Sequence, residues 1–280
     1  MIIPMNLPLT KTDGPIICDV SAEKGGVGKT TLANFLRDYG LEGGLSVYMI
    51  RIESRRILPT PAPGETLIHS EDFVEAQERV GGSASLFEPV EAILKKAKAS
   101  SGIVVIDWGA GLTSHRLKVY TETGLDLWLA AEGIRGLSFV VTTREVDVME
   151  QAARNLASMR TVAPGLMPVL VLNELQGHFQ ITEETMGVQG KVFEKTLMAA
   201  AQEAPIIKLP LIGAKGWQPF HSAGMNMRDV LRLDPSQLAK RIGRSDFTTR
   251  SCVSHVSKWW HDSTEELEKV LSFRTEEIAQ

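Results

Sequence analysis

Short hydrophobic runs alternate along the chain with segments in which hydrophobic residues follow helical spacing. Five runs have the length of a strand, and a sixth candidate follows them; they span residues 15–21, 45–52, 102–107, 137–143, 168–173 and 205–213. Between the runs, hydrophobic residues recur at intervals of three and four, as over residues 90–97 and 146–159. This pattern predicts repeated β–α units, and therefore an α/β fold with a mostly parallel sheet flanked by helices.

Two segments depart from this alternation. Residues 58–70 are rich in proline and polar residues, so we expect a surface loop there. From residue 235 onward the spacing is helical and no strand pattern is visible. We therefore expect an α/β domain over residues 1–234 and a helical C-terminal extension over residues 235–280 that packs on the same domain.

The composition limits the class of protein. The chain of 280 residues carries a formal net charge of −4, so any binding to nucleic acid has to be regional. Cys18 and Cys252 are too few for a disulfide framework or a zinc site, and we expect reduced thiols in the cytosol. No stretch has the pattern of a signal peptide or a membrane span, which predicts a cytoplasmic protein without a membrane partner.

The sequence SAEKGGVGKTT, residues 21–31, follows the first hydrophobic run and opens a helical segment. In this context the backbone N–H groups of residues 25–30 can converge on a phosphate, supported by the partial positive charge of the helix N-terminus. Lys29 would supply a mobile cation, and the Thr30 hydroxyl would be a ligand of Mg²⁺. The residues predicted to contact the nucleotide here are Gly25, Gly26, Val27, Gly28, Lys29, Thr30 and Thr31.

Two positions depart from the common pattern G-x-x-x-x-G-K-[ST]. Glu23 occupies the position of the first glycine, and a second lysine, Lys24, precedes the glycines. The sequence KGGVGKTT resembles the deviant Walker A motif of the ParA/MinD family of ATPases. This resemblance implies a P-loop NTPase-type fold, ATP and Mg²⁺ as cofactors, and a homodimer in the ATP state. It also implies that Lys24 is the signature lysine, which reaches the phosphates bound by the partner.

Further family landmarks follow in the expected order over residues 14–175. The sequence GIVVIDWGAGL, residues 102–112, resembles the Walker B strand and switch II, which implies that Asp107 holds the Mg²⁺ shell through water. Gly109 and Gly111 would leave this loop able to move. The sequence VLVLN resembles the strand whose terminal asparagine lies near the nucleotide base, so Asn173 is a candidate contact.

Two landmarks differ from the family. Where the family has D-x-D-P after the second strand, this chain reads RIES, so Arg51 reverses a charge and Glu53 is the carboxylate left to orient water. Switch II has Trp108-Gly109-Ala110 in place of Pro-Pro. We therefore expect hydrolysis that is slow or depends on a partner. The candidate catalytic residues are Lys24, Lys29, Glu53 and Asp107.

The C-terminal extension changes charge along its length. Between residues 236 and 258 one acid, Asp246, stands against the basic residues Lys240, Arg241, Arg244, Arg250 and Lys258. This stretch suits non-specific binding to the DNA backbone, as ParA-like proteins bind the nucleoid; a solvated helix face is the alternative. Acids dominate from residue 262 onward, and anionic lipid would repel them. We expect Trp259 and Trp260 to pack in the protein rather than to stack on bases.

The sequence thus favours a nucleoid-associated, ParA-like ATPase that segregates or positions a plasmid or mobile element, with a small adaptor or ParB-like activator. Two alternatives stay open. A nucleotide-gated scaffold with weak ATPase activity is favoured by Arg51 and the altered switch II. A P-loop ligase or small-molecule kinase would need acids or bases around a substrate pocket, which the sequence does not reveal, and Lys24 disfavours it.

Overall fold

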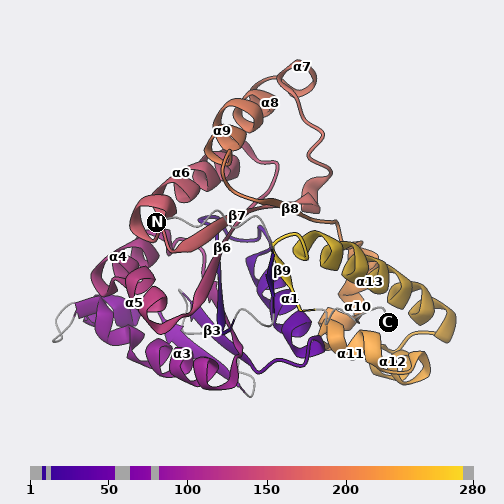
Figure 1. Cartoon of the computed structure of the whole chain (residues 1–280). Helices are drawn as coiled ribbons and strands as arrows, with labels where there is room; N and C mark the ends of the chain where they lie inside the picture. Colours follow the sequence, from indigo (N-terminus) through magenta and orange to yellow (C-terminus); the bar gives the residue numbers. More distant parts are fainter. Residues whose placement is uncertain (1–7, 11–13, 54–63, 77–81, 274–280) are drawn as a thin grey trace, which may run out of the picture.

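The computed structural model describes residues 8–10, 14–53, 64–76 and 82–273 (Figure 1). Its central sheet has seven strands in the order β4-β3-β5-β2-β6-β7-β8, and every neighbouring pair is parallel. The strands are β2 Ile16–Ser21, β3 Val47–Glu53, β4 Glu65–His69, β5 Ile103–Trp108, β6 Arg135–Thr142, β7 Leu166–Asn173 and β8 Ile206–Leu209. The protein therefore has an α/β fold built on a parallel sheet, as the sequence predicts.

Six of these strands coincide with the predicted hydrophobic runs, but β4 does not. It lies in the segment 58–70, which the sequence predicts as a loop; residues 58–63 are outside the described ranges. The prediction is wrong for residues 65–69. β4 is an edge strand paired with β3, and Ile68 is its one buried side chain. Such a strand forms through backbone pairing with its neighbour and needs no hydrophobic run, so the pattern misses it.

Helices cover both faces of the sheet (Figure 1). Those that precede β8 are α1 Lys29–Glu42, α2 Glu71–Ala76, α3 Glu88–Ser100, α4 Thr113–Thr123, α5 Leu125–Glu132, α6 Val146–Val162, α7 Glu183–Met186, α8 Val188–Val192 and α9 Met198–Ala200, with 3₁₀ turns at Gly82–Phe87 and Glu174–Gln176 and a π-helical turn at Phe193–Leu197. α3 and α6 confirm the helices predicted from spacing. In β2, Cys18 belongs to the core that includes α1, and Ile17 belongs to the core that includes α3 and α4. Both faces of the central strand are thus buried, which explains its continuous hydrophobic run.

In the described part of the chain after β8, four helices share a small hydrophobic core. They are α10 Ala214–Ser222, α11 Met227–Arg232, α12 Pro235–Ile242 and α13 Asp246–Leu267. The core takes one or more side chains from each helix, among them Phe220, Val230, Leu238 and Val256. This helical cluster lies beside α1 (Figure 1).

The C-terminal half of α13 packs on α1. The rings of Trp259 and Trp260 lie 5.3 and 5.0 Å from the ring of Phe35, measured between centroids. Trp259 is 3% exposed, so the predicted packing role of these tryptophans is confirmed. After α13, β9 (Leu271–Ser272) pairs in parallel with β1 (Leu9–Thr10), which contradicts the expectation of no strand after residue 235. A pairing of two residues is too short to leave an alternating pattern in the sequence.

Membrane spans, metal clusters and disulfides can be checked in the described part of the chain. No helix there combines the length and the hydrophobicity needed to cross a membrane. No group of three or more His, Cys, Asp and Glu side chains there could hold a metal ion. Cys18 and Cys252 are both buried and not joined to each other. The acids expected at the end of the chain, Glu276 and Glu277, lie outside the described ranges.

Candidate nucleotide-binding site

The loop between β2 and α1 is a left-handed glycine turn that leads directly into the helix. Gly26 and Gly28 have φ angles of +76° and +99°, in the left-handed region that disfavours side chains. At Gly28 a Cβ atom would stand 2.1 Å from Nδ2 of Asn173. Gly28 is also the N-terminal cap position of α1, and no described side chain caps this helix end. The first amides of α1 can therefore bind an anion, with the helix dipole in favour.

Lys29 closes over the loop that precedes it. Its Nζ atom donates a hydrogen bond to the carbonyl oxygen of Lys24 at 2.8 Å, and the residue is 7% exposed. Burial lowers the pKa of Lys29, while the nearby carboxylates of Asp107, Glu53 and Glu23 act in the opposite direction. The charges of three acids thus act on this ammonium group. The predicted phosphate lysine lies in the loop as expected, among groups of opposite charge.

Thr30 and Asp107, the two predicted Mg²⁺ ligands, meet at the carboxyl edge of the sheet. Asp107 is the last but one residue of β5 and is 1% exposed. Burial raises the pKa of Asp107 to about 6, while Arg51, a hydrogen bond with the Thr30 side chain and Lys29 lower it. A hydroxyl and a carboxylate in contact are the hard oxygen donors that Mg²⁺ takes, directly or through water. The residues present therefore fit the implied metal.

Arg51 lies on β3, directly beside Asp107 on β5 in the register of the sheet. Its Nη1 donates to Oδ2 of Asp107 at 3.0 Å, and its Nη2 donates to Oδ1 of Asn34 at 2.7 Å. Its Nε and Nη2 also donate to the two carboxylate oxygens of Glu65, at 3.3 and 3.2 Å. The charge reversal seen in the sequence is thus part of a side-chain network. The sequence did not predict that Asn34 and Glu65 belong to the site. Glu65 lies in the segment that the sequence predicts as a loop.

The loop after β5 contacts both the end of β3 and the glycine-rich loop. The Gly109 N–H donates to the Ile52 carbonyl at 2.6 Å, and the Gly111 N–H donates to the Glu23 carbonyl at 2.8 Å. A Cβ atom at Gly109 would lie 2.9 Å from the carbonyl oxygen of Ile52 and 3.3 Å from Oε2 of Glu53. Glycine is therefore required at position 109 for close approach. The charge of Glu53, the last residue of β3, raises the pKa of both Asp107 and Lys29.

A buried polar cluster ties this loop to the strand before the glycine-rich loop. Asp19 of β2 accepts hydrogen bonds from Nε1 of Trp108 at 2.6 Å, the hydroxyl of Tyr120 at 2.7 Å and the hydroxyl of Ser138 at 3.0 Å. Arg116 of α4 forms an ion pair with Asp19 at 3.3 Å. Both charged side chains are fully buried. Trp108, which replaces a family proline, thus has a structural role that the sequence does not reveal.

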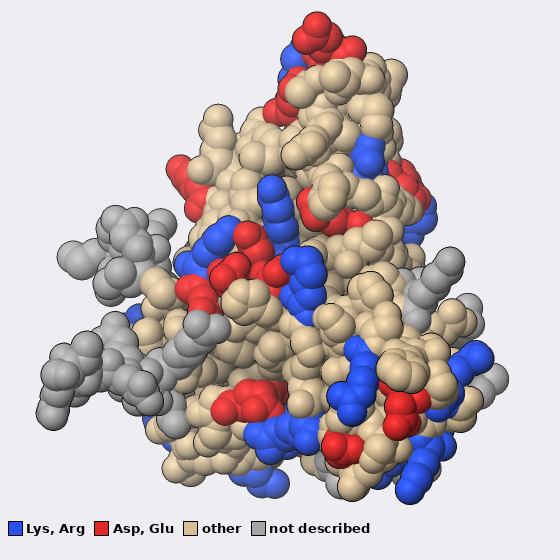
Figure 2. All heavy atoms as spheres, turned by 90° about the vertical axis from the view of Figure 1, so that its right-hand side faces the viewer, with Lys and Arg blue, Asp and Glu red and all other residues tan. Residues whose placement is uncertain are grey.

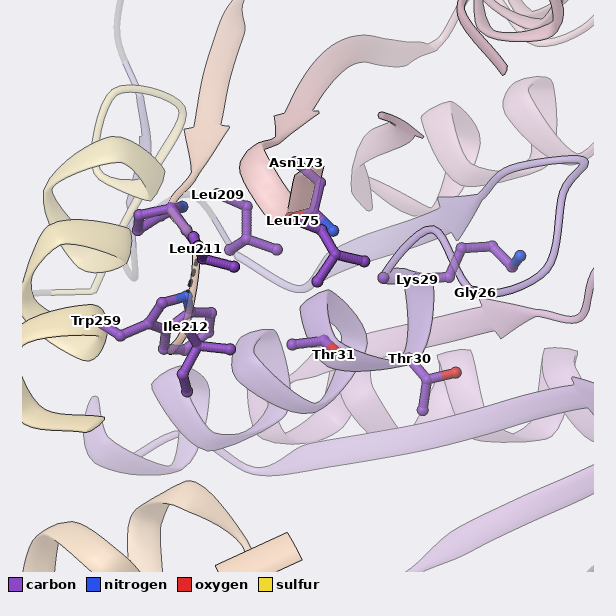
Figure 3. A pocket seen from close by; sticks show the side chains of 12 residues that line it. Gly26, Lys29, Thr30, Thr31, Asn173, Leu175, Leu209, Leu211, Ile212 and Trp259 are labelled. Atoms are coloured by element: carbon purple, nitrogen blue, oxygen red, sulfur yellow. Dashed lines mark hydrogen bonds between the residues drawn. The ribbon is translucent and has the colours of Figure 1, made fainter. Parts of the chain in front are cut away.

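A cavity of about 250 Å³ opens beside the glycine-rich loop (Figure 3). Its polar end is formed by Gly28, Lys29 and Thr31, and its apolar end by residues that follow β7 and β8, together with Trp259. Leu175 and Leu211 line it and are 46% and 51% exposed. Such exposed leucines at a cavity are typical of a ligand site.

Asn173 lies at the junction of the two ends of this cavity. Its Nδ2 donates to the Val27 carbonyl at 2.7 Å, so the end of β7 is fixed against the glycine-rich loop. On the other side, Nε1 of Trp259 donates to the Pro210 carbonyl at 2.7 Å, which fixes the loop after β8. The predicted contact Asn173 is therefore at the cavity, and Trp259 is a supporting residue that joins α13 to its wall.

Lys24 does not face this cavity. Its Nζ donates to the carboxylate of Glu145, at the N-terminus of α6, and to Oδ2 of Asp147 at 3.2 Å. Nε2 of Gln176 donates to the other oxygen of Glu145 at 2.6 Å. These hydrogen bonds, with Glu145 first, raise the pKa of Lys24. The second lysine of the loop thus has partners within its own chain.

The five basic residues of the stretch 236–258 are all exposed, on α12, α13 and the turn between them; they are Lys240, Arg241, Arg244, Arg250 and Lys258. Lys258 forms an ion pair with Asp262 at 2.8 Å. Figure 2 shows this side of the molecule, where basic side chains stand among acidic ones. The surface is therefore mixed in charge rather than uniformly basic.

No protein-family model and no curated protein sequence matches this chain. Among solved structures, the chain is similar to the MinD cell division protein of Aquifex aeolicus, with 16% sequence identity and a TM-score of 0.42. The match covers 89% of this chain and 98% of that chain. A likeness at this level does not assign a family, so the case for a function rests on the geometry of the chain's own residues.

Proposed function

We propose that this chain is an ATPase of the ParA/MinD type that binds ATP together with Mg²⁺. The observation that carries the proposal is the convergence of four features at the carboxyl edge of a parallel sheet. These are the left-handed glycine turn, the uncapped N-terminus of α1, the buried Lys29, and the contact between Thr30 and Asp107. Together they provide amide donors, a cation and metal ligands for a triphosphate.

Each residue then has a defined role in phosphoryl transfer. The amides of residues 25–30 hold the phosphates, and Lys29 exchanges its bond to the Lys24 carbonyl for a phosphate oxygen. Thr30 and Asp107 would hold Mg²⁺, which would neutralise phosphate charge when bound. Glu53, close to Lys29 and Asp107, orients the attacking water. The cavity between Asn173 and Trp259 accepts the base.

The homodimer expected in the ATP state requires a change at Lys24. Lys24 is bound to Glu145 and Asp147 in the single chain, with 40% of its side chain exposed. To reach the phosphates of a partner it has to leave these carboxylates. A triphosphate carries more negative charge than either acid, so a facing nucleotide can compete for the lysine.

DNA binding is the proposed role of α12 and α13. The two helices are joined by residues 243–245, and Gly243 has a φ angle of +65°. A short turn with a glycine between two helices is also the connection of helix-turn-helix units. The exposed Arg241 and Arg244 lie at this turn, and the exposed Arg250 follows in α13, where its charge lowers the pKa of Asp234. We propose that these arginines contact phosphates on a duplex without sequence preference.

The role that unites these properties is segregation or positioning of a plasmid or mobile element, in the cytoplasm and on the nucleoid, with a small adaptor or ParB-like activator. A nucleotide-gated scaffold with weak ATPase activity is the second candidate. The contact between Arg51 and Asp107 favours it, because a cation fixed on the metal-binding carboxylate weakens its hold on Mg²⁺.

Measurements of ATP binding and turnover, each with and without duplex DNA, separate these functions. Binding with turnover that rises on addition of DNA supports the ParA-like ATPase. Binding with no turnover in either condition supports the scaffold. The absence of ATP binding would contradict both.

A further inference from the structure

Arg51 places a permanent positive charge beside the carboxylate predicted to serve the metal. The two side chains are 17% and 2% exposed, and Nη1 of Arg51 lies 3.0 Å from Oδ2 of Asp107. A buried carboxylate without a partner is strongly disfavoured, so this contact stabilises the charged form of Asp107. Arg51 therefore does for Asp107, within the fold, part of what a bound cation would do.

The guanidinium is held in place from other sides. Asn34 of α1 accepts from Nη2 at 2.7 Å, and Glu65 of β4 accepts from Nε and Nη2. Together with Asp107 of β5, these contacts fix the planar group from three elements. This limits the freedom of the guanidinium to move away from Asp107.

Glu65 does not fully neutralise Arg51, because Glu65 also forms an ion pair with a second arginine. Nη1 of Arg37 lies 3.3 Å from Oε1 of Glu65. The nearest carboxylate that Arg51 does not share with another arginine in the described structure is Asp107.

We propose that Arg51 is a built-in counter-cation for Asp107, so that this chain binds nucleotide with little dependence on Mg²⁺. The inference rests on the proposed nucleotide-binding function. Two effects act in the same direction. The neutralised Asp107 no longer repels the phosphates of a metal-free nucleotide, and it attracts Mg²⁺ less than a free carboxylate does.

The test is a titration with a fluorescent ATP analogue, in Mg²⁺ and in EDTA, on wild type and three variants. For the wild type we expect the dissociation constants in the two buffers to agree within about threefold. For Arg51→Gln we expect EDTA to weaken binding by about tenfold or more, because Asp107 then repels the phosphates. Lys95→Gln is the matched control: it removes a positive charge from the exposed face of α3, away from Asp107, and should behave as wild type.

Arg51→Lys keeps the charge without the planar fork and should fall between wild type and Arg51→Gln. Thermal melting of each variant reports folding; if Arg51→Gln does not fold, the wild-type and Arg51→Lys titrations still decide. A wild type whose affinity collapses in EDTA, or an Arg51→Gln protein with the same response as wild type, overturns the inference while nucleotide binding stands. A wild type that binds no analogue in either buffer overturns the proposed function and the inference with it.

Discussion

Lys24 and Glu145, which are 121 positions apart in the sequence, form an ion pair that joins the glycine-rich loop to the N-terminus of α6. Asp147 is a second partner, and Gln176 binds the other oxygen of Glu145. The extra lysine of the loop is therefore held in cis. If it acts across a dimer, it does so by exchanging carboxylates for phosphates, and the strength of these ion pairs influences dimer formation.

Lys24→Ala should bind ATP but fail to dimerise. Lys29 and the loop amides remain in cis, so the affinity for an ATP analogue should stay within about twofold of wild type. Without Lys24, the repulsion between two facing triphosphates is not offset. Size-exclusion chromatography with light scattering, with ADP and with a slowly hydrolysed analogue, measures this. A variant that dimerises like the wild type would exclude a role for Lys24 in trans.

The combined change Glu145→Gln with Asp147→Asn should strengthen dimerisation. It frees Lys24 without altering the lysine itself, and because the pairs are exposed we expect a gain of only about twofold to fivefold in dimer affinity. The same light-scattering measurement applies, over a series of protein concentrations. Glu183→Gln, which removes an exposed ion pair with Lys195 on another part of the surface, is the control. Weaker dimerisation would mean that the two acids belong to the dimer interface instead.

Lys29→Ala should abolish nucleotide binding. The ammonium group is buried in the loop beside Thr30 and Asp107, and its loss leaves the phosphates among the carboxylates of Asp107, Glu53 and Glu23. We expect a loss of affinity of about a hundredfold or more in a fluorescent ATP titration. Lys95→Ala, on the exposed face of α3, should bind normally. Equal affinity in the two variants would remove the phosphate-loop assignment.

The cluster around Asp19 should stabilise the fold. Tyr120→Phe removes one hydrogen bond to a buried carboxylate and should lower the free energy of unfolding by about 1.5–3 kcal/mol. Asp19→Ala leaves Arg116 buried without its ion-pair partner, at a cost of about 3–5 kcal/mol. Urea denaturation measures both. Tyr48→Phe, whose hydroxyl meets Ser100 at the surface, is the control and should change stability by less than about 0.5 kcal/mol.

Arg241→Glu with Arg244→Glu should weaken binding to any duplex and flatten its salt dependence. Both side chains are exposed near the turn between α12 and α13, and each phosphate contact adds to the slope of log affinity against log salt. The assay is fluorescence anisotropy with duplexes of unrelated sequence, in ATP at several salt concentrations. Lys95→Glu with Lys96→Glu makes the same change of net charge on α3. If both double variants lose affinity equally, the effect is one of net charge and α12 is not the binding surface.

Most of the fold could be predicted from the sequence, because its strongest signals are local. Buried parallel strands require continuous hydrophobic runs, and helices on a sheet require apolar residues at intervals of three and four. Where the signal is weak the prediction is wrong. β4 has one buried side chain and β9 has two residues, so each depends on a neighbouring strand that the local pattern does not show.

Some features of the candidate site could likewise be predicted from the sequence, and others could not. By itself the sequence predicted a candidate phosphate loop, since the glycines, a lysine and a threonine at a helix start are neighbours in the chain. Only the tertiary structure decided what Lys24 and Arg51 contact. Glu145 and Asp107 lie 121 and 56 positions away from them, and they come into reach because β2 lies between β5 and β6 and β3 lies beside β5. Side-chain partners across a sheet follow from the order and register of its strands, and no local pattern encodes that order.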